Sequence, residues 1–150
     1  MFREAFWLSP EKVLAHELTH IILFRFLNGP ILLALNEGFA EFVSFRQLAV
    51  QFDGNEYHLR TISKIPKEKF IPLQSLIGMR HYPEDEVEIF YQESELLVRF
   101  MILNFNKENF YAFLQKISKG EDIKKAMKDF YDLEFEDFSK KFEAFAVAKN

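Results

Sequence analysis

Apolar residues recur every three or four positions along most of this chain, which is the spacing of helices that bury one face. The first such run starts at Ser9-Pro10-Glu11, which combines a capping residue, a first-turn proline and an acid at the positive end of a helix dipole. It stops at Asn28-Gly29-Pro30, where a C-cap glycine precedes a proline. A first helix is therefore expected between these two signals.

The rest of the chain has the same helical character. A second helix is expected from near Ala34–Asn36 to about Phe52, and residues 56–83 are expected to be irregular with short helices because prolines and a glycine interrupt them. A long helix should open at Pro83-Glu84-Asp85-Glu86. Further helices are expected over residues 107–119, 122–131 and 135–148, and the one strand candidate is a short segment within residues 1–8. The pattern predicts a single compact, mainly α domain over residues 1–150.

Composition narrows the class of protein. Nineteen phenylalanines indicate an aromatic core between the helices, and the net charge of −4 with scattered Lys and Arg argues against a nucleic-acid partner. Residues 21–35 form the most apolar run, but Arg25 and Asn28-Gly29-Pro30 interrupt it, so no membrane span is expected. No signal peptide is visible, which favours a cytoplasmic location. Oligomeric state is not indicated.

The pentapeptide HELTH, residues 16–20, carries the clearest chemistry. His16 and His20 are four residues apart, so on a helix both imidazoles project from one face and can bind the same ion. Glu17 is rotated by about 100° from His16 and can reach a water on that ion. The chain has no cysteine, so a metal must be held by His, Asp or Glu. A catalytic zinc keeps three protein ligands, and the motif supplies two.

The best candidate for the third ligand lies in Asn36-Glu37-Gly38-Phe39-Ala40-Glu41. A helix that begins near Asn36 can turn back along the first helix and present Glu37 to the metal. Gly38 would allow a neighbouring backbone or a substrate to approach closely. Glu41 lies one turn beyond Glu37 and can accept a hydrogen bond from a ligand histidine, which fixes the orientation of the ring.

HELTH followed by LNEGFAEFVS resembles the gluzincin metallopeptidases, in particular the peptidase MA-like branch that includes the aminopeptidase N type enzymes. The resemblance implies the catalytic and C-terminal helical part of that fold, one Zn²⁺ ion and a peptide or protein substrate. It also implies His16, His20 and Glu37 as ligands, Glu17 as the base that activates the attacking water, and Glu41 as the carboxylate that holds His16.

A further segment, YQESELLVRFMI from Tyr91, is similar to the family segment whose tyrosine donates a hydrogen bond to the oxyanion of the tetrahedral intermediate. Tyr91 takes this role by resemblance, although Glu93 and Ser94 stand where the aminopeptidases usually have Lys-Gly. His81-Tyr82 is an alternative source of the donor.

The chain also departs from the family. The spacing from His20 to Glu37 is shorter than the family's usual separation of about eighteen residues, and only fifteen residues precede His16. Residues 1–9 are therefore interpreted as a candidate remnant of a missing N-terminal lobe. The Gly-Ala-Met-Glu-Asn segment that anchors a free N-terminus is absent, so aminopeptidase specificity is not implied.

Three functional hypotheses follow. The first is hydrolysis of peptide bonds by a zinc-dependent enzyme with Glu17 as general base. The second is a zinc-binding but catalytically silent domain with a structural or partner-binding role. The third is a helical interaction module without a metal.

Overall fold

The computed structural model describes residues 10–53 and 63–149, and the side chains of residues 10–44 and 63–149. Over these residues the chain forms seven α-helices and one short 3₁₀ helix, with no strand, which confirms the mainly α class. The expected strand within residues 1–8 lies outside the described residues. None of the described helices is both long and apolar enough to cross a membrane.

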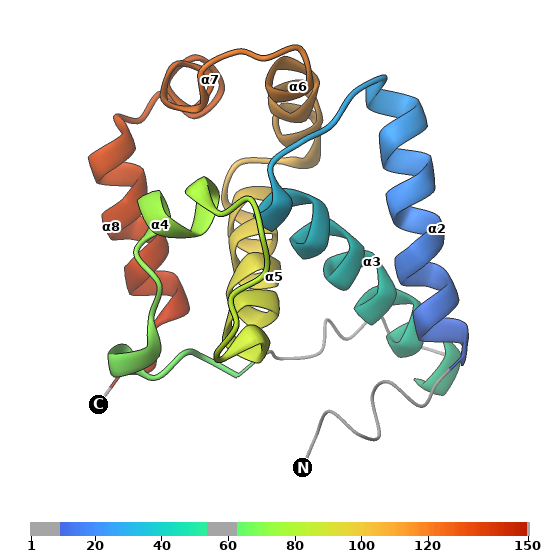
Figure 1. Ribbon diagram of the computed structural model, residues 1–150. Helices are drawn as coiled ribbons and strands as arrows, with labels where there is room; N and C mark the ends of the chain where they lie inside the picture. The colour runs from blue at the N-terminus through green and yellow to red at the C-terminus, as the bar shows by residue number, and fades with distance from the viewer. Residues whose placement is uncertain (1–9, 54–62, 150) are drawn as a thin grey trace.

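The bounds of the elements are α2 Pro10–Leu27, α3 Leu33–Asp53, η1 Lys67–Lys69, α4 Leu73–Gly78, α5 Val87–Asn104, α6 Lys107–Ser118, α7 Ile123–Tyr131 and α8 Phe135–Ala146. α3 and α5 form the central pair of the fold (Figure 1). α3 packs most extensively against α5 and then against α2, while α6, α7 and α8 close the other side of α5. Residues Ile65 and Val147 form an isolated parallel bridge that ties the segment before α4 to the end of α8.

The turn between α2 and α3 forms where the sequence predicts it, but a different residue provides the backbone conformation that ends α2. Asn28 has the left-handed backbone conformation, with φ of 54°, so the asparagine terminates the helix instead of the expected glycine. Gly29 serves the packing: a Cβ at this position would lie 2.9 Å from the backbone oxygen of Ser118 in α6. The turn then sends α3 back along α2 (Figure 1).

α5 begins later than expected. The acidic run after Pro83 is not helical, because Glu86 adopts a left-handed conformation with φ of 52° and α5 starts at Val87. A proline followed by acids is a common helix start, but it does not determine at which residue the helix begins.

α3 and α5 approach each other most closely at Gly38. A Cβ on Gly38 would lie only 2.1 Å from the backbone oxygen of Ser94, which leaves no room for a side chain. This confirms that Gly38 allows close approach of a neighbouring backbone. The contact holds the first half of α3, which carries Glu37, against the centre of the molecule.

The phenylalanines predicted to form an aromatic core do so around the C-terminal helices. Phe100 of α5 lies 5.4 Å from Phe138 and 5.8 Å from Phe142 of α8, and Tyr131 of α7 lies 4.6 Å from Phe105, between ring centroids. Phe138 and Phe142 are fully buried. Such rings combine a large apolar area with favourable edge and tilted contacts, so this cluster anchors α5 against α8.

Candidate metal centre

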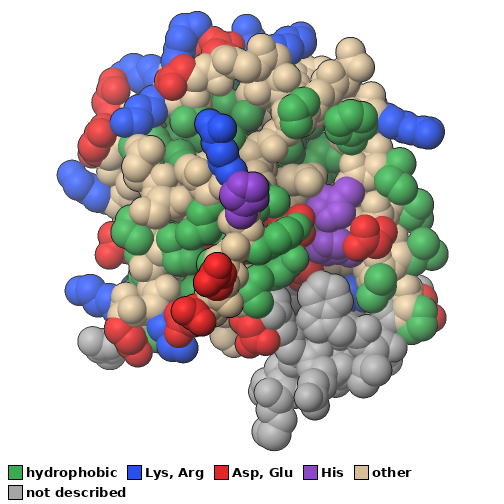
Figure 2. Space-filling view, viewed as in Figure 1, with side chains coloured by type: hydrophobic (Ala, Val, Ile, Leu, Met, Phe, Trp, Pro, Cys, Tyr) green, Lys and Arg blue, Asp and Glu red, His purple; other side chains and the backbone are tan. Residues whose placement is uncertain are grey.

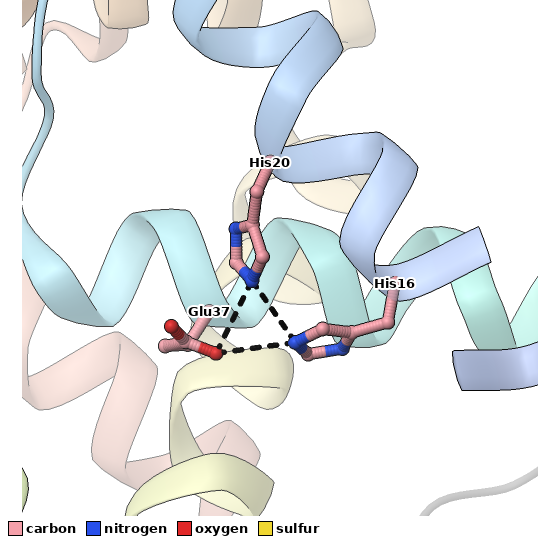
Figure 3. Close-up of side chains that lie close together, drawn as sticks. All are labelled: His16, His20 and Glu37. Atoms are coloured by element: carbon pink, nitrogen blue, oxygen red, sulfur yellow. Dashed lines mark hydrogen bonds and ion pairs between the residues drawn. The ribbon is translucent and has the colours of Figure 1, made fainter. Parts of the chain in front are cut away.

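Three side chains from two helices converge at the contact between α2 and α3 (Figure 3). His16 and His20 come from successive turns of α2, and Glu37 comes from the first half of α3. The Nε2 atoms of the two histidines are 3.0 Å apart, and Glu37 Oε2 lies 3.3 Å from His16 Nε2 and 3.6 Å from His20 Nε2. Among the described residues, these three form the group of His and acidic side chains with the geometry to hold a metal ion.

The spacing of these atoms matches a tetrahedral metal site. Ligand atoms about 2.0–2.1 Å from a zinc ion in tetrahedral geometry are separated from one another by about 3.3 Å. The observed separations of 3.0, 3.3 and 3.6 Å lie on both sides of this value. Two imidazole nitrogens and one carboxylate oxygen are also a donor set that zinc accepts. The residues present therefore fit such an ion.

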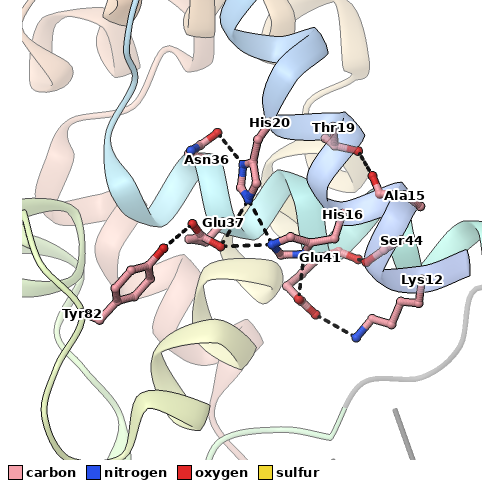
Figure 4. Close-up of polar contacts among 10 residues, drawn as sticks. All are labelled: Lys12, Ala15, His16, Thr19, His20, Asn36, Glu37, Glu41, Ser44 and Tyr82. Atoms are coloured by element: carbon pink, nitrogen blue, oxygen red, sulfur yellow. Dashed lines mark hydrogen bonds and ion pairs between the residues drawn. The ribbon is translucent and has the colours of Figure 1, made fainter. Parts of the chain in front are cut away.

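The outer nitrogen of each histidine has its own oxygen partner (Figure 4). His16 Nδ1 lies 3.0 Å from Glu41 Oε1, and His20 Nδ1 lies 3.1 Å from Asn36 Oδ1. Glu41 and Asn36 each offer an acceptor oxygen to an Nδ1 atom, and the two Nε2 atoms face each other and Glu37. An acceptor beside Nδ1 favours the proton on that atom and leaves Nε2 for a metal ion, which is the arrangement that metal binding requires.

The carboxylates of the cluster favour a positive charge on the histidines. Burial opposes a charge on His16, but the contacts with Glu37 and Glu41 outweigh it and raise the pKa of His16 to about 9. The contact with Glu37 raises the pKa of His20 as well. Burial also opposes the charge on Glu37, yet the two histidines and a tyrosine lower its pKa to about 2. The metal-free cluster therefore keeps a proton on His16, and a metal cation that binds there would replace this proton.

Glu41 is held from both sides. Its Oε2 lies 3.4 Å from Lys12 Nζ, while its Oε1 faces His16, so the carboxylate bridges a lysine and a candidate ligand (Figure 4). Lys12 is only 2% exposed, which is rare for lysine. Sequence reasoning identified Glu41 but missed Lys12. Its position one turn before His16, on the same helix face, was the available signal.

Tyr82 completes the surroundings of Glu37. Its hydroxyl donates a hydrogen bond of 2.7 Å to Glu37 Oε1, which leaves Oε2 directed at the histidines. The sequence offered Tyr82 as an alternative oxyanion donor and did not predict this contact. Tyr91 stacks on Tyr82 with ring centroids 5.8 Å apart, so it lies one ring away from the residue that touches Glu37.

The remaining candidates lie near the surface. Glu17, between the two histidines on α2, and His81, beside Tyr82, are both exposed. The side chain of His20 is 22% exposed, compared with 6% for His16 and 5% for Glu37. Figure 2 shows histidine and acidic side chains together on this face of the molecule. The cluster is therefore approached from solvent on the His20 side.

Comparison of the chain with protein-family models, with curated proteins and with solved structures gave no match.

Proposed function

We propose that this chain is a zinc-dependent peptidase in which His16, His20 and Glu37 bind the metal. The observation that carries the proposal is the convergence of two Nε2 atoms and one carboxylate oxygen at tetrahedral spacing, with an acceptor oxygen beside each outer nitrogen. Four ionisable side chains are buried in contact at this site: Lys12, His16, Glu37 and Glu41. A structural role alone would not need them, because burying ionisable groups is costly unless their charges are compensated.

Each residue has a proposed part in the reaction. Zinc held by the three ligands would supply Lewis-acid chemistry, polarising the scissile carbonyl and raising the acidity of water. Glu17 takes a proton from the attacking water and delivers it to the nitrogen of the leaving amine. Glu41 and Asn36 hold the two ligand rings, and Tyr82 holds Glu37, so that the ligands do not reorganise during turnover.

Tyr91 is the proposed donor to the oxyanion. Glu37 already accepts the hydrogen bond of Tyr82, which gives that hydroxyl a role in orienting a ligand. Tyr91→Phe should therefore lower kcat and leave zinc affinity unchanged, whereas Tyr82→Phe should weaken zinc binding. The reverse result would make Tyr82 the oxyanion donor.

The central test measures zinc content and peptide cleavage in parallel. Glu17→Gln should bind one zinc ion and lose cleavage, Glu37→Ala should lose both, and Glu84→Gln, an exposed glutamate outside the cluster, should keep both. Full zinc content in Glu37→Ala would make the ligand assignment wrong. Tight zinc binding by the wild type without cleavage of a broad peptide library would support the catalytically silent domain instead.

A further inference from the structure

α2 exposes large apolar side chains on the face opposite the one that packs into the molecule. The face that packs into the molecule carries Lys12, His16, Thr19, Leu23 and Leu27. On the opposite face, side chains that would ordinarily be buried are largely exposed. They are Leu14 at 59%, Leu18 at 44%, Ile21 at 52% and Ile22 at 62%. An exposed helix face of large aliphatic side chains has the composition of a contact surface.

The exposed residues have the spacing of a helix–helix seam. Glu11, Leu14, Leu18, Ile21 and Arg25 follow one another at intervals of three, four, three and four residues. This is the repeat with which two helices pack along a common line. We call these five residues the α2 stripe. Its centre is apolar and its two ends carry opposite charges.

The exposed aliphatic face has the size of a contact patch. Its four side chains, Leu14, Leu18, Ile21 and Ile22, present on the order of 400 Å² of accessible surface, about half of the ~800 Å² that each partner contributes to an interface of standard size. Phe24 and Phe26, which are 62% and 64% exposed, project to either side of this face. Exposed apolar patches of this extent on single chains usually mark interaction sites.

We propose that the α2 stripe binds a second copy of this chain, with the two α2 helices antiparallel about a twofold axis near Leu18. In this arrangement the Arg25 end of each helix meets the Glu11 end of the other, and the aliphatic residues between them pack together. A parallel pair would instead place Arg25 against Arg25 and Glu11 against Glu11. The charges at the ends therefore favour the antiparallel pair, and a twofold axis makes the contact self-complementary.

The α2 stripe does not include the metal cluster. His16 and His20 point from α2 toward α3 (Figure 4), whereas the stripe lies on the opposite side of the same helix. The proposal is therefore independent of peptidase activity and of zinc binding.

Sedimentation of the full chain tests the pairing. The wild type should be a dimer that dissociates on dilution, and Leu18→Glu should be a monomer up to roughly 100 µM, because a charge at the centre of an apolar seam cannot be solvated. Leu103→Glu is the matched control, since Leu103 is 53% exposed but lies on α5, and it should remain a dimer. Helical circular dichroism confirms that each variant is folded, whether or not it binds zinc.

A charge exchange tests the orientation. Arg25→Glu should weaken the dimer by about tenfold, and the double variant Glu11→Arg, Arg25→Glu should restore it. Loss of the dimer in both would contradict the antiparallel arrangement. A wild type that is monomeric at roughly 100 µM, or a Leu18→Glu variant that still dimerises, would overturn the proposal and assign the face to another occupant.

Discussion

The α2–α3 contact and the core formed by α5, α7 and α8 are both buried, but they are built from different residues. The first contains Lys12, His16, Glu37 and Glu41 within a few ångströms of one another. The second is a cluster of aromatic rings with apolar neighbours. The aromatic core gains from burial itself, whereas the polar contact gains only if its charges are compensated. Stability and proposed function therefore reside in different parts of one small fold.

The largest expected effect comes from opening the aromatic core. Phe138→Ala removes a fully buried ring that contacts Phe100 and Tyr131, and it should lower the free energy of unfolding by about 3–5 kcal/mol. Denaturant titration measures this loss, with Leu103→Ala on the surface as control. Zinc affinity of the folded variant should be unchanged, and a parallel loss of affinity would show that the two regions are coupled.

The next effect belongs to the polar contact. Zinc at about 1,000 times its Kd should raise the free energy of unfolding by about 4 kcal/mol, because the ion binds only the folded arrangement. Glu37→Gln should abolish this increment, because it replaces the anionic ligand with a neutral amide. Unfolding with and without a chelator measures the increment. An equal increment in the variant would contradict the proposed ligand set.

A smaller effect is the pH dependence of the metal-free protein. The pKa of His16 is raised from 6.5 to about 9, so its stabilising contribution is complete below pH 6.5 and is lost as pH rises through 9. The pKa of Glu37 is lowered from 4.5 to about 2, so its contribution is complete above pH 4.5 and is lost as pH falls through 2. With chelator present, the cluster should therefore stabilise the fold most between pH 4.5 and 6.5.

The loss on going from pH 6 to pH 9 should be on the order of 2–3 kcal/mol for the metal-free protein. Zinc should act in the opposite direction, because it replaces the proton on His16 and so binds more tightly as pH rises toward 9. Denaturation at a series of pH values, with and without zinc, separates the two slopes. Parallel slopes would mean that zinc does not displace this proton.

The sequence predicts features that depend on local spacing better than contacts that depend on tertiary packing. Helical periodicity located the helices that build the aromatic core, and the four-residue spacing of His16 and His20 placed both on one helix face. HELTH together with the segment LNEGFAEFVS also predicted that Glu37 and Glu41 lie at the cluster, as they do. These features depend on local spacing, which a helix converts directly into geometry.

Contacts that depend on tertiary packing were not predictable in the same way. Tyr82 meets Glu37 across 45 positions, and it reaches Glu37 from the segment before the left-handed Glu86, where no periodic pattern operates. The burial of Lys12 depends on how closely α2 lies against α3, and so on the turn at Asn28 and on Gly29 packing against Ser118. Side-chain contacts that depend on loop conformation and on helix packing are only weakly indicated by a single sequence.

Lys12 offers the finest test of the difference between the two regions. Lys12→Met keeps a long apolar stem in the buried position but removes the cation from Glu41. Glu41 then has one anchor fewer, the ring of His16 is held less firmly, and zinc affinity should fall by about 10–100-fold.

Competition with a chelator measures that affinity, and the histidine Nδ1–H resonance in the NMR spectrum reports whether His16 keeps its contact with Glu41. Lys12→Arg should restore both, because it returns the charge, whereas a role in packing alone would be satisfied by methionine. If Lys12→Met bound zinc as the wild type does and lost only stability, Lys12 would belong with the aromatic core as a packing residue. The predicted result would instead extend the candidate metal centre one turn further along α2, to a lysine that orients a proposed ligand through an intervening carboxylate.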